Sequence, residues 1–495
     1  MFQITPLHDR WHGLTPWGQR AALIGAGGLA GLGHAPFDWP LITILALGFG
    51  LWVAHAQARP RFQDGWFLGL GYFAVTMNWI IEPFLVDAAS TGWMALPALG
   101  GLAAGLALFW GLAFRAVPQN ASVLVLCVAL AVAEYIRGHI LTGFPWALVG
   151  YVWVDTPLYQ AAAWVGPYGM TLLSILCAAT IARGRVWVGM PLLAGLAVAA
   201  WLPAPMGSEP GPEPANDAPV VRLIHPNVAQ ADKWHPDTRD GIYQSQLKLT
   251  QQQPPVDLTI WPETSVYLPI HLAQPEIAAA ANGGHVIVGS IRGTPDDLYY
   301  NSLNVVSPAG AIVAHYDKTR LVPFGEYVPL GEFAAKFGIH GLAAHDGLWF
   351  ATGPGPQVLD VPGIGKIQPL ICYEGIFPQF VGATDVRADM LVMISNDAWF
   401  GRFSGPAQHL AQARARSIEL GLPMLRVANQ GISAVIDARG GVISSAGVDD
   451  TGFVQSPIPP ARAATFYSQY RDWPVLALSL FLLGLGAFTP RRVWC

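Results

Sequence analysis

The sequence has few charged residues, and its N-terminal part has no lysine. Asp, Glu, Lys and Arg make up 12% of the 495 residues, whereas a typical soluble domain has about 25%. Of the 27 Lys and Arg and 32 Asp and Glu residues, only 15 lie before position 204, and the first lysine is Lys233. This shortage excludes a disordered chain and a wholly soluble protein. The net charge of −5 argues against a nucleic-acid partner bound through bulk positive charge.

Cysteine is also scarce, at four residues. Four cysteines do not build a disulfide framework, and no Cys-rich or His-rich spacing typical of a metal site accompanies them. The sequence therefore predicts no metal and no cofactor. Cys127 and Cys177 lie in apolar runs and are interpreted as packing residues, and Cys495 is the last residue. Cys372 follows a strand-like run and is the candidate for chemistry.

Long apolar stretches are abundant. Each approaches the roughly 20 apolar residues that cross a membrane as a helix, so we predict seven transmembrane helices in a membrane domain over residues 1–203 and an eighth near the end of the chain. The first would be an uncleaved anchor, because no small-residue cleavage site follows it. GAGGLAGLG (25–33) is interpreted as helix packing rather than a phosphate-binding loop, since no strand precedes it. The predicted spans are 20–36, 39–57, 66–86, 92–114, 120–137, 157–182, 186–203 and 473–489.

Arginine placement predicts the orientation of these helices. Cytoplasmic loops are enriched in Lys and Arg, and an N-terminus in the cytoplasm puts nine arginines on that side, with Arg137 the main exception. Residues 204–472 would then face the periplasm of a bacterium, and both termini would be cytoplasmic in the inner membrane. The nine are Arg10, Arg20, Arg59, Arg61, Arg115, Arg183, Arg185, Arg491 and Arg492.

A more polar part follows the seventh predicted helix. Residues 204–219 are rich in Pro, Gly and acidic residues and cannot build a core, so they are predicted as a linker. Runs rich in Val and Ile then alternate with helical patterns at 270–282 and 406–420, which predicts an α/β domain over 220–465. The predicted strands are 220–228, 257–263, 285–291, 301–307, 311–318, 367–374, 389–397 and 432–437.

Three of these runs end in residues that can do chemistry together. WPET carries Glu263, HYDKTRLVPFGEYVP carries Lys318 and Glu326, and LICYEG carries Cys372 and Glu374. A thiol attacks an acyl carbon as the thiolate, which a neighbouring base or cation promotes. Glu263 could take the thiol proton, and Lys318 could stabilise the thiolate and a tetrahedral oxyanion. Each residue alone would be interpreted as a surface carboxylate or a core cysteine, so the prediction depends on the ordered set.

The same motifs carry a resemblance. Glu in WPE, Lys in Y-x-K-x-x-L-V-P-F-G-E and Cys in I-C-Y-E resemble the Glu-Lys-Cys triad of the nitrilase superfamily across residues 220–460. The eight predicted helices, with YYNS, LVPFGEYVP, ISNDAWFG and GFPW, resemble one membrane branch of that superfamily, apolipoprotein N-acyltransferase. The resemblance implies an α-helical membrane domain with eight transmembrane helices and an α/β domain folded as an αββα sandwich.

The resemblance also implies roles for individual residues. Cys372 would be the nucleophile, Glu263 the general base and Lys318 the cation on the oxyanion side, with Glu326 and Glu374 in support. The other implied residues are Tyr373, whose backbone N–H could serve the oxyanion hole, Trp234 at the mouth of the site, Asn301 as a positioning residue, and Trp399, which either lines an acyl pocket or belongs to the core.

The implied reaction has two stages. Cys372 would attack an ester carbonyl of a membrane phospholipid, leaving a lysophospholipid and a thioester. The α-amino group of an S-diacylglyceryl-cysteine at an apolipoprotein N-terminus would then take the acyl chain, giving triacylated lipoprotein by a ping-pong mechanism. The expected partners are the phospholipid donor, the diacylglyceryl-apolipoprotein acceptor and the membrane, and the expected state is a monomer. The alternatives are a membrane-tethered amidase of the nitrilase type and a non-catalytic lipoprotein-binding scaffold.

A few features allow two interpretations. Glu134 and Arg137 either pair structurally or contact a lipid headgroup. Residues 395–397 either cap a turn or contact the substrate. The apolar segment 327–351 is predicted to be an arm in the membrane interface, with a packed insertion as the alternative. His225 departs from the family pattern, which affects local hydrogen bonding but not the triad.

Overall fold

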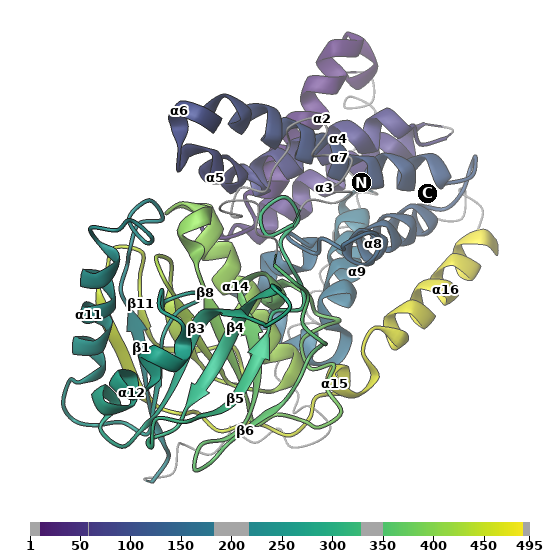
Figure 1. Ribbon diagram of the computed structural model, residues 1–495. Helices are drawn as coiled ribbons and strands as arrows, with labels where there is room; N and C mark the ends of the chain where they lie inside the picture. Colours follow the sequence, from purple (N-terminus) through teal and green to yellow (C-terminus); the bar gives the residue numbers. More distant parts are fainter. Residues whose placement is uncertain (1–9, 58, 183–216, 328–349, 489–495) are drawn as a thin grey trace. The chain divides into compact units, whose positions relative to one another are not determined.

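The computed structural model describes residues 10–57, 59–182, 217–327 and 350–488 (Figure 1). The chain divides into two units, and each is described by itself. The predicted seventh span, nearly all of the predicted linker and the predicted arm lie outside the described residues. The first unit comprises 1–206, 403–411 and 465–495, and the second comprises 207–402 and 412–464.

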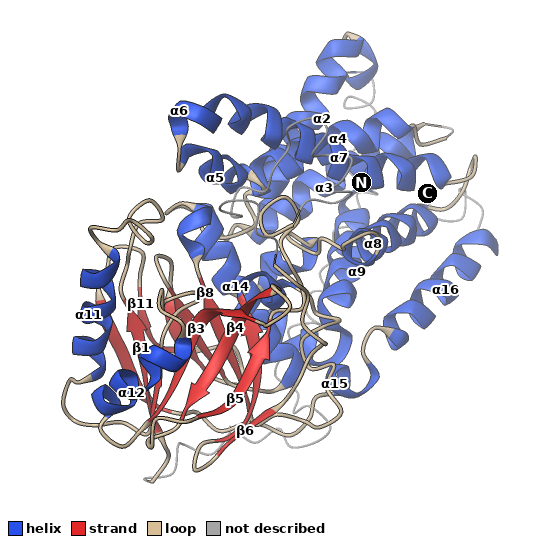
Figure 2. Ribbon diagram, in the orientation of Figure 1, coloured by secondary structure: helices blue, strands red, loops and turns tan. Residues whose placement is uncertain are grey.

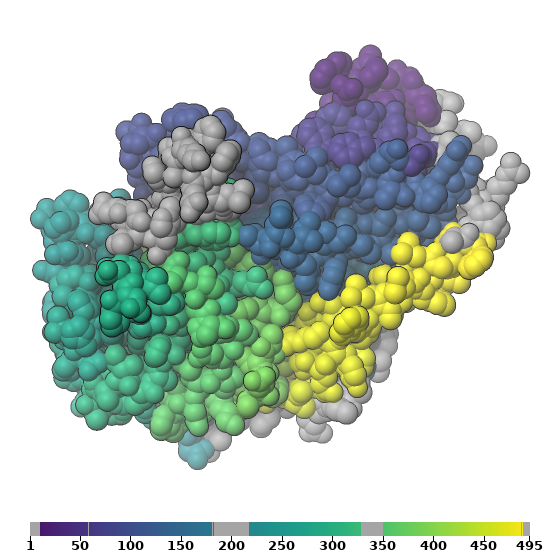
Figure 3. All heavy atoms as spheres, turned by 45° about the vertical axis from the view of Figure 1, so that its right-hand side comes forward, coloured from purple at the N-terminus to yellow at the C-terminus, as the bar shows by residue number. Residues whose placement is uncertain are grey.

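The first unit is built from helices (Figure 2). Thr15 accepts a hydrogen bond from the N–H of Gly18 and is followed by proline, so it caps the first long helix. The elements are α2 (Pro16–Gly31), α3 (Pro40–Ala56), α4 (Phe62–Thr76), η1 (Asn78–Ile81), α5 (Glu82–Leu85), α6 (Ala88–Thr91), η2 (Gly92–Met94), α7 (Ala95–Ala116), α8 (Val123–His139), η3 (Val149–Trp153), η4 (Pro157–Ala161), α9 (Ala162–Ala182), α15 (Phe466–Tyr470) and α16 (Trp473–Phe488). The C-terminal helix α16, yellow in Figure 3, lies along α8.

Some of these helices are long and apolar enough to cross a membrane. Within the described residues, Ala88–Ala116 and Pro157–Thr180 qualify by length and hydropathy. The stretch predicted as one span over 66–86 is instead broken, because Phe62–Thr76 and Asn78–Leu85 are bent by 64° at the break. If that bent pair is one span, the described helices supply three. The apolar helices α3 and α16 are shorter, so eight spans remain a prediction.

Glycines let α2 and α4 approach each other closely. A Cβ atom on Gly27 would lie 1.9 Å from the backbone oxygen of Leu68, and one on Gly71 would lie 1.9 Å from that of Ile24. No side chain fits at either position, as expected where small residues bring two helices together. This contact confirms the interpretation of GAGGLAGLG as a packing segment.

An ion pair is buried within the helical unit. Arg137 Nη2 lies 2.7 Å from Glu134 Oε2, and both side chains are almost fully buried. Trp110 Nε1 donates to Glu134 Oε1 at 2.8 Å, and Arg137 donates to the carbonyls of Phe144 and Trp146. Both charged groups are thus saturated by protein partners. This arrangement favours structural pairing over a contact with a lipid headgroup.

The second unit contains two six-stranded sheets. Their strands are β1 (Val220–His225), β2 (Leu258–Ile260), β3 (His285–Gly293), β4 (Tyr299–Val306), β5 (Ile312–Asp317), β6 (Leu359–Val361), β7 (Gly365–Ile371), β8 (Met390–Ser395), β9 (Met424–Ala428), β10 (Ser433–Ile436), β11 (Val442–Ala446) and β12 (Gly452–Pro457). The orders are β12-β1-β2-β3-β4-β5 and β11-β10-β9-β8-β7-β6. In each sheet three neighbouring strands are parallel, β1 to β3 and β7 to β9, and the flanking pairs are antiparallel.

The two sheets face each other across an apolar core. Leu223 and Ile260 of the first sheet belong to one buried cluster with Ile371 and Val392 of the second. The helices α11 (Arg239–Thr250) and α12 (Ile270–Ala281) cover the outer face of the first sheet through a second cluster around Trp261. The helix α14 (Ser404–Leu420), divided between the units, lies beside the second sheet from Gln412 onward (Figure 1).

This arrangement confirms the predicted α/β domain with two sheets. The eight predicted strands appear as β1 to β5, β7, β8 and β10, and the two predicted helices as α12 and α14. Four strands (β6, β9, β11 and β12) and the helix α11 were not predicted.

Candidate active site

The reactive side chains lie at the C-terminal ends of strands. Lys318 is the residue after β5, Cys372 is the residue after β7, and Glu263 comes shortly after β2. β5 runs in the same direction as the parallel strands of its sheet, because two antiparallel pairings separate it from β3. The three residues are 1%, 5% and 5% exposed, respectively. Two sheets thus contribute to one buried site.

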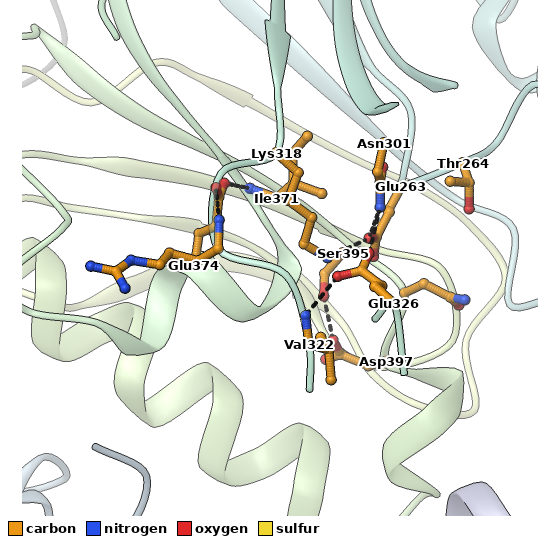
Figure 4. Close-up of polar contacts among 12 residues, drawn as sticks. Glu263, Thr264, Asn301, Lys318, Val322, Glu326, Ile371, Glu374, Ser395 and Asp397 are labelled. Carbon is orange, nitrogen blue, oxygen red and sulfur yellow. Dashed lines mark hydrogen bonds and ion pairs between the residues drawn. The ribbon is translucent and has the colours of Figure 1, made fainter. Parts of the chain in front are cut away.

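Lys318 holds two carboxylates at once. Its Nζ lies 3.1 Å from Glu263 Oε1 and 2.9 Å from Glu326 Oε1. Asn301 Nδ2 donates to the same two oxygens, at 2.7 Å and 3.1 Å (Figure 4). The ammonium and the amide therefore bridge the carboxylates and fix where each one points.

A backbone hydrogen bond holds Glu326 in this cluster, and the side-chain oxygen of Asn301 has an unused capacity to accept a hydrogen bond. Glu326 Oε2 accepts from the backbone N–H of Val322 at 2.9 Å, so the loop after β5 holds Glu326 in place (Figure 4). Asn301 Oδ1 is buried and has no hydrogen-bond partner among the described residues. Since buried polar groups are normally paired, this oxygen is suited to a substrate N–H.

Cys372 occupies an unusual backbone conformation. Its φ is +51°, in the left-handed region that non-glycine residues rarely adopt. It directly follows the last residue of β7 and is the first residue of the short helix η6 (Cys372–Ile376). Such sparsely populated conformations are concentrated at functional sites, where surrounding contacts hold them.

Glu374 provides contacts of that kind. Its Oε2 accepts from the N–H of Ile371 at 2.8 Å. Its Oε1 accepts from the hydroxyl of Tyr316 at 2.7 Å and from the N–H groups of Thr319 and Arg320 at 2.6 and 3.1 Å. The carboxyl therefore ties the strand end before Cys372 to the segment after Lys318, and so fixes the nucleophile candidate relative to the cation.

The charges favour an ionised Glu263 beside a protonated thiol. Burial raises the pKa of the Glu263 carboxyl, but Lys318 and Lys233 outweigh burial, so this pKa lies below its ordinary value. Burial lowers the pKa of the Lys318 ammonium, but Glu263 and Glu326 raise it further, so Lys318 stays protonated. Burial, with the Glu263 charge, raises the pKa of the Cys372 thiol. Glu263 is thus ionised and able to accept a proton, while the Cys372 thiol is still protonated.

The last residue of β8 also reaches the thiol. The Ser395 hydroxyl hydrogen-bonds the Cys372 side chain and donates to Asp397 Oδ1 at 2.6 Å (Figure 4). Asp397 Oδ2 in turn lies 2.6 Å from Arg426 Nη2, and this ion pair is fully buried. Ser395 therefore does more than cap a turn, because it contacts the candidate nucleophile.

The remaining predicted residues lie around this centre. Tyr373 follows Cys372 in η6 and is buried against Phe377. Trp234 is half-buried and lines a small cleft together with Lys233 and Thr264, the residue after Glu263. Trp399, in η7 (Asp397–Phe400), is half-buried and makes no described hydrogen bond to the triad residues. Among the described residues, no group of three or more His, Cys, Asp or Glu side chains is placed to hold a metal ion.

His225 and Lys233 are two further buried polar residues of this unit. His225 is buried, and its ring nitrogens contact Ser433 Oγ at 2.8 Å and the carbonyl of Gly447 at 3.0 Å, so its hydrogen bonds are satisfied away from the triad. Lys233 was not predicted from the sequence to be a site residue. Its Nζ donates to the backbone oxygen of Glu263 at 2.8 Å and to Thr264 Oγ1 at 2.7 Å.

Comparison with known proteins covers both units. Residues 26–180 match the family described as apolipoprotein N-acyltransferase N-terminal domain, and residues 227–467 match carbon-nitrogen hydrolase. The apolipoprotein N-acyltransferase of Caulobacter vibrioides is 38% identical, over 94% of this chain and 93% of that protein. The enzyme of that name from Rhizobium etli is 34% identical, over 94% and 96%.

A solved structure also resembles the chain. An amidase from Nesterenkonia sp. is 16% identical, with a TM-score of 0.36, and the match covers 55% of this chain and 99% of that one. These two relatives decide the assignment, because they are 34% or more identical over more than nine-tenths of both chains. The chain belongs to the apolipoprotein N-acyltransferase family.

Proposed function

We propose that the chain transfers a fatty acyl chain from a membrane phospholipid, through a thioester on Cys372, to the N-terminal α-amino group of S-diacylglyceryl-cysteine in apolipoproteins. The observation that carries this proposal is the buried arrangement of Glu263, Lys318 and Cys372, in a chain that is similar over 94% of its length to an apolipoprotein N-acyltransferase. The product is a lipoprotein with a third, amide-linked acyl chain.

In the first stage Cys372 takes the acyl chain. Glu263 accepts the thiol proton, and the sulfur attacks the ester carbonyl carbon of the phospholipid. The Lys318 ammonium and the backbone N–H of Tyr373 stabilise the oxyanion that forms. As the carbon–oxygen bond breaks, the protonated Glu263 gives its proton to the leaving oxygen. A lysophospholipid departs, and a thioester remains.

In the second stage the lipoprotein amine takes the acyl chain. The free amine attacks the thioester carbonyl, and Glu263 removes a proton from the attacking nitrogen. The carbon–sulfur bond then breaks, and the proton on Glu263 returns to the thiolate, which restores the starting site. Asn301 Oδ1, the buried acceptor without a described partner, is suited to orienting the amine through its N–H.

The electrostatics support this use of the residues. A general base must be unprotonated before the reaction, and the lowered pKa of Glu263 supplies that state. Lys318 is held between two carboxylates, and a cation fixed in this way could stabilise developing negative charge without rearrangement during the reaction.

The location follows from the sequence pattern. We propose that the chain is a multi-pass protein of a bacterial inner membrane with eight spans, both termini in the cytoplasm and the sandwich unit in the periplasm. The distribution of arginine supports this orientation. A catalytic domain on that face could meet phospholipid and lipoprotein laterally as a monomer.

The intact mass of the purified protein after incubation with phospholipid alone tests the proposal. We expect a fatty-acyl mass increase that hydroxylamine removes and that is absent from Cys372→Ala. If neither the adduct nor lysophospholipid appears, phospholipid is not the donor. An adduct of equal size in Cys372→Ala would exclude Cys372 as the nucleophile. Adding a diacylated lipopeptide should then discharge the adduct and release the triacylated product.

A further inference from the structure

Lys233 is the second ammonium group next to Glu263. It is 7% exposed, and its Nζ donates to the backbone oxygen of Glu263 and the hydroxyl of Thr264. Thr264 has a φ of +44°, an uncommon value for a threonine. Lys233 therefore holds the turn that carries Glu263. A lysine is an expensive choice for this task, because a neutral donor would make the same hydrogen bonds without a buried charge.

The charge count of the buried site explains why a lysine is useful there. Glu263 and Glu326 carry two negative charges, and Lys318 supplies one positive charge. Asp397 is already paired with Arg426, and Glu374 is bound by the Tyr316 hydroxyl and backbone N–H groups. Without Lys233 the cluster around Glu263 would hold an uncompensated negative charge. With it, two cations face two carboxylates.

The balance between positive and negative charges in the site also holds during proton transfer. When the proton of Cys372 moves to Glu263, one negative charge moves from oxygen to sulfur, and the total does not change. The two ammonium groups therefore compensate the site both before and after proton transfer. We propose that Lys233 is a positioning residue of the active centre, whose positive charge, not only its hydrogen bonds, keeps Glu263 ionised and makes the Cys372 thiolate accessible at neutral pH.

This inference rests on the proposed roles of Cys372 and Glu263. The charges that act on this pair are those of Lys318 after β5, Asp397 after β8 and Lys233 itself, and Glu326 in the loop after β5 acts on Lys318. Burial lowers the pKa of Lys233 to about 8, against the opposing effects of Glu263 and Cys372. The ammonium form therefore predominates at neutral pH and is lost in mildly alkaline solution.

The rate at which iodoacetamide alkylates Cys372 tests the inference. The full-length protein in detergent, without lipid, is treated between pH 5 and 10, and the mass of the Cys372 peptide separates this thiol from the other cysteines. An opposite charge at close range shifts a pKa by about 1–3 units. We expect Lys233→Met to move the alkylation profile about one pH unit upward and to slow the reaction about tenfold at neutral pH.

Three control variants separate the effect of the Lys233 charge from the effect of its hydrogen bonds. Lys233→Gln keeps a donor but loses the charge, so it should shift the profile as Lys233→Met does, even if the methionine variant folds poorly. Lys233→Arg keeps the charge and should stay near the unsubstituted profile. Thr264→Val removes one hydrogen bond and keeps the charge, so it should not shift the profile.

The outcomes distinguish this inference from the proposed function. If the Lys233→Gln profile overlies that of the unsubstituted protein, the charge has no role and the inference is wrong. The inference is also wrong if Thr264→Val shifts the alkylation profile as far as Lys233→Gln does, because the loss of a hydrogen bond alone would then explain the shift. If Glu263→Gln alkylates like the unsubstituted protein at every pH, the assignment of the base fails first, and the proposed mechanism fails with it.

Discussion

The helical unit and the sandwich unit both bury charged side chains, but they satisfy them differently. In the helical unit, Glu134 and Arg137 bind each other, and the nearby tryptophan and backbone carbonyls complete the set. In the sandwich unit, Lys318 is shared between Glu263 and Glu326, and a protonated thiol lies beside them. A saturated ion pair stabilises a fold, whereas a shared cation leaves a carboxylate able to accept a proton.

The largest effect should come from removing that proton acceptor. Glu263→Gln keeps the shape of the side chain but cannot take the thiol proton, so we expect thioester formation to slow by about 10³-fold, within the range for general-base catalysis. The time course of the acyl mass increase measures this rate. A loss below about tenfold would show that another group serves as the base.

The next effect should come from the carboxyl that joins the two strand ends. Glu374→Gln places an N–H group against the donors around it, so thioester formation should slow by about 10- to 100-fold, the equivalent of one lost charged hydrogen bond. Burial raises the pKa of Glu374 to about 7. Because the ionised form is the one that accepts these bonds, the rate should fall as pH drops below about 7.

A pH–rate profile of the unsubstituted protein checks the predicted fall in rate below about pH 7. Its acid limb should be centred near pH 7 and should disappear in Glu374→Gln, whose amide does not titrate in this range. An unchanged acid limb in the variant would assign that titration to a different group.

The smallest effect on chemistry should come from the saturated pair. Glu134→Gln leaves Arg137 buried without its counter-charge and should lower the free energy of unfolding by about 3–5 kcal/mol. The rate per folded molecule should stay within about twofold, because these residues take no part in the proposed reaction. The double variant Glu134→Gln/Arg137→Met should recover part of the stability. Thermal unfolding in detergent and the acylation time course measure the two quantities, and a large loss of rate at full stability would point to a lipid contact instead.

Local patterns predicted the strands that carry chemistry. Runs such as IQPLICYE and DMLVMISND are apolar and end in polar residues, so β7 and β8 were visible in the sequence. β9 was missed because Arg426 lies in its middle, and only the structure shows that Asp397 neutralises this arginine. The helix α11, RDGIYQSQLKLT, is polar with an internal glycine and has little amphipathic signal. The break after Thr76 likewise leaves no mark in hydropathy.

The candidate site was likewise predicted only in part from the sequence. Glu263, Lys318 and Cys372 belong to motifs that could be identified by residue type and order. Lys233 contacts a backbone carbonyl and a threonine hydroxyl, and neither is a charged partner that would mark the interaction in the sequence. Glu374 was predicted to be a supporting residue, but its contacts could not be predicted. Three of its four hydrogen-bond donors lie more than 50 positions before it in the sequence, and the fourth is the last residue of β7.

The direction of β7 has a practical consequence. Cys372 lies at one end of this strand, and the exposed turn at Gly363 that joins β6 to β7 lies at the other. At about 3.3 Å per residue, the seven-residue strand separates the two by roughly 20 Å. A fluorescent label or a short epitope inserted at Gly363 would therefore report on the folding and membrane topology of the sandwich unit while leaving the chemistry at the far end untouched.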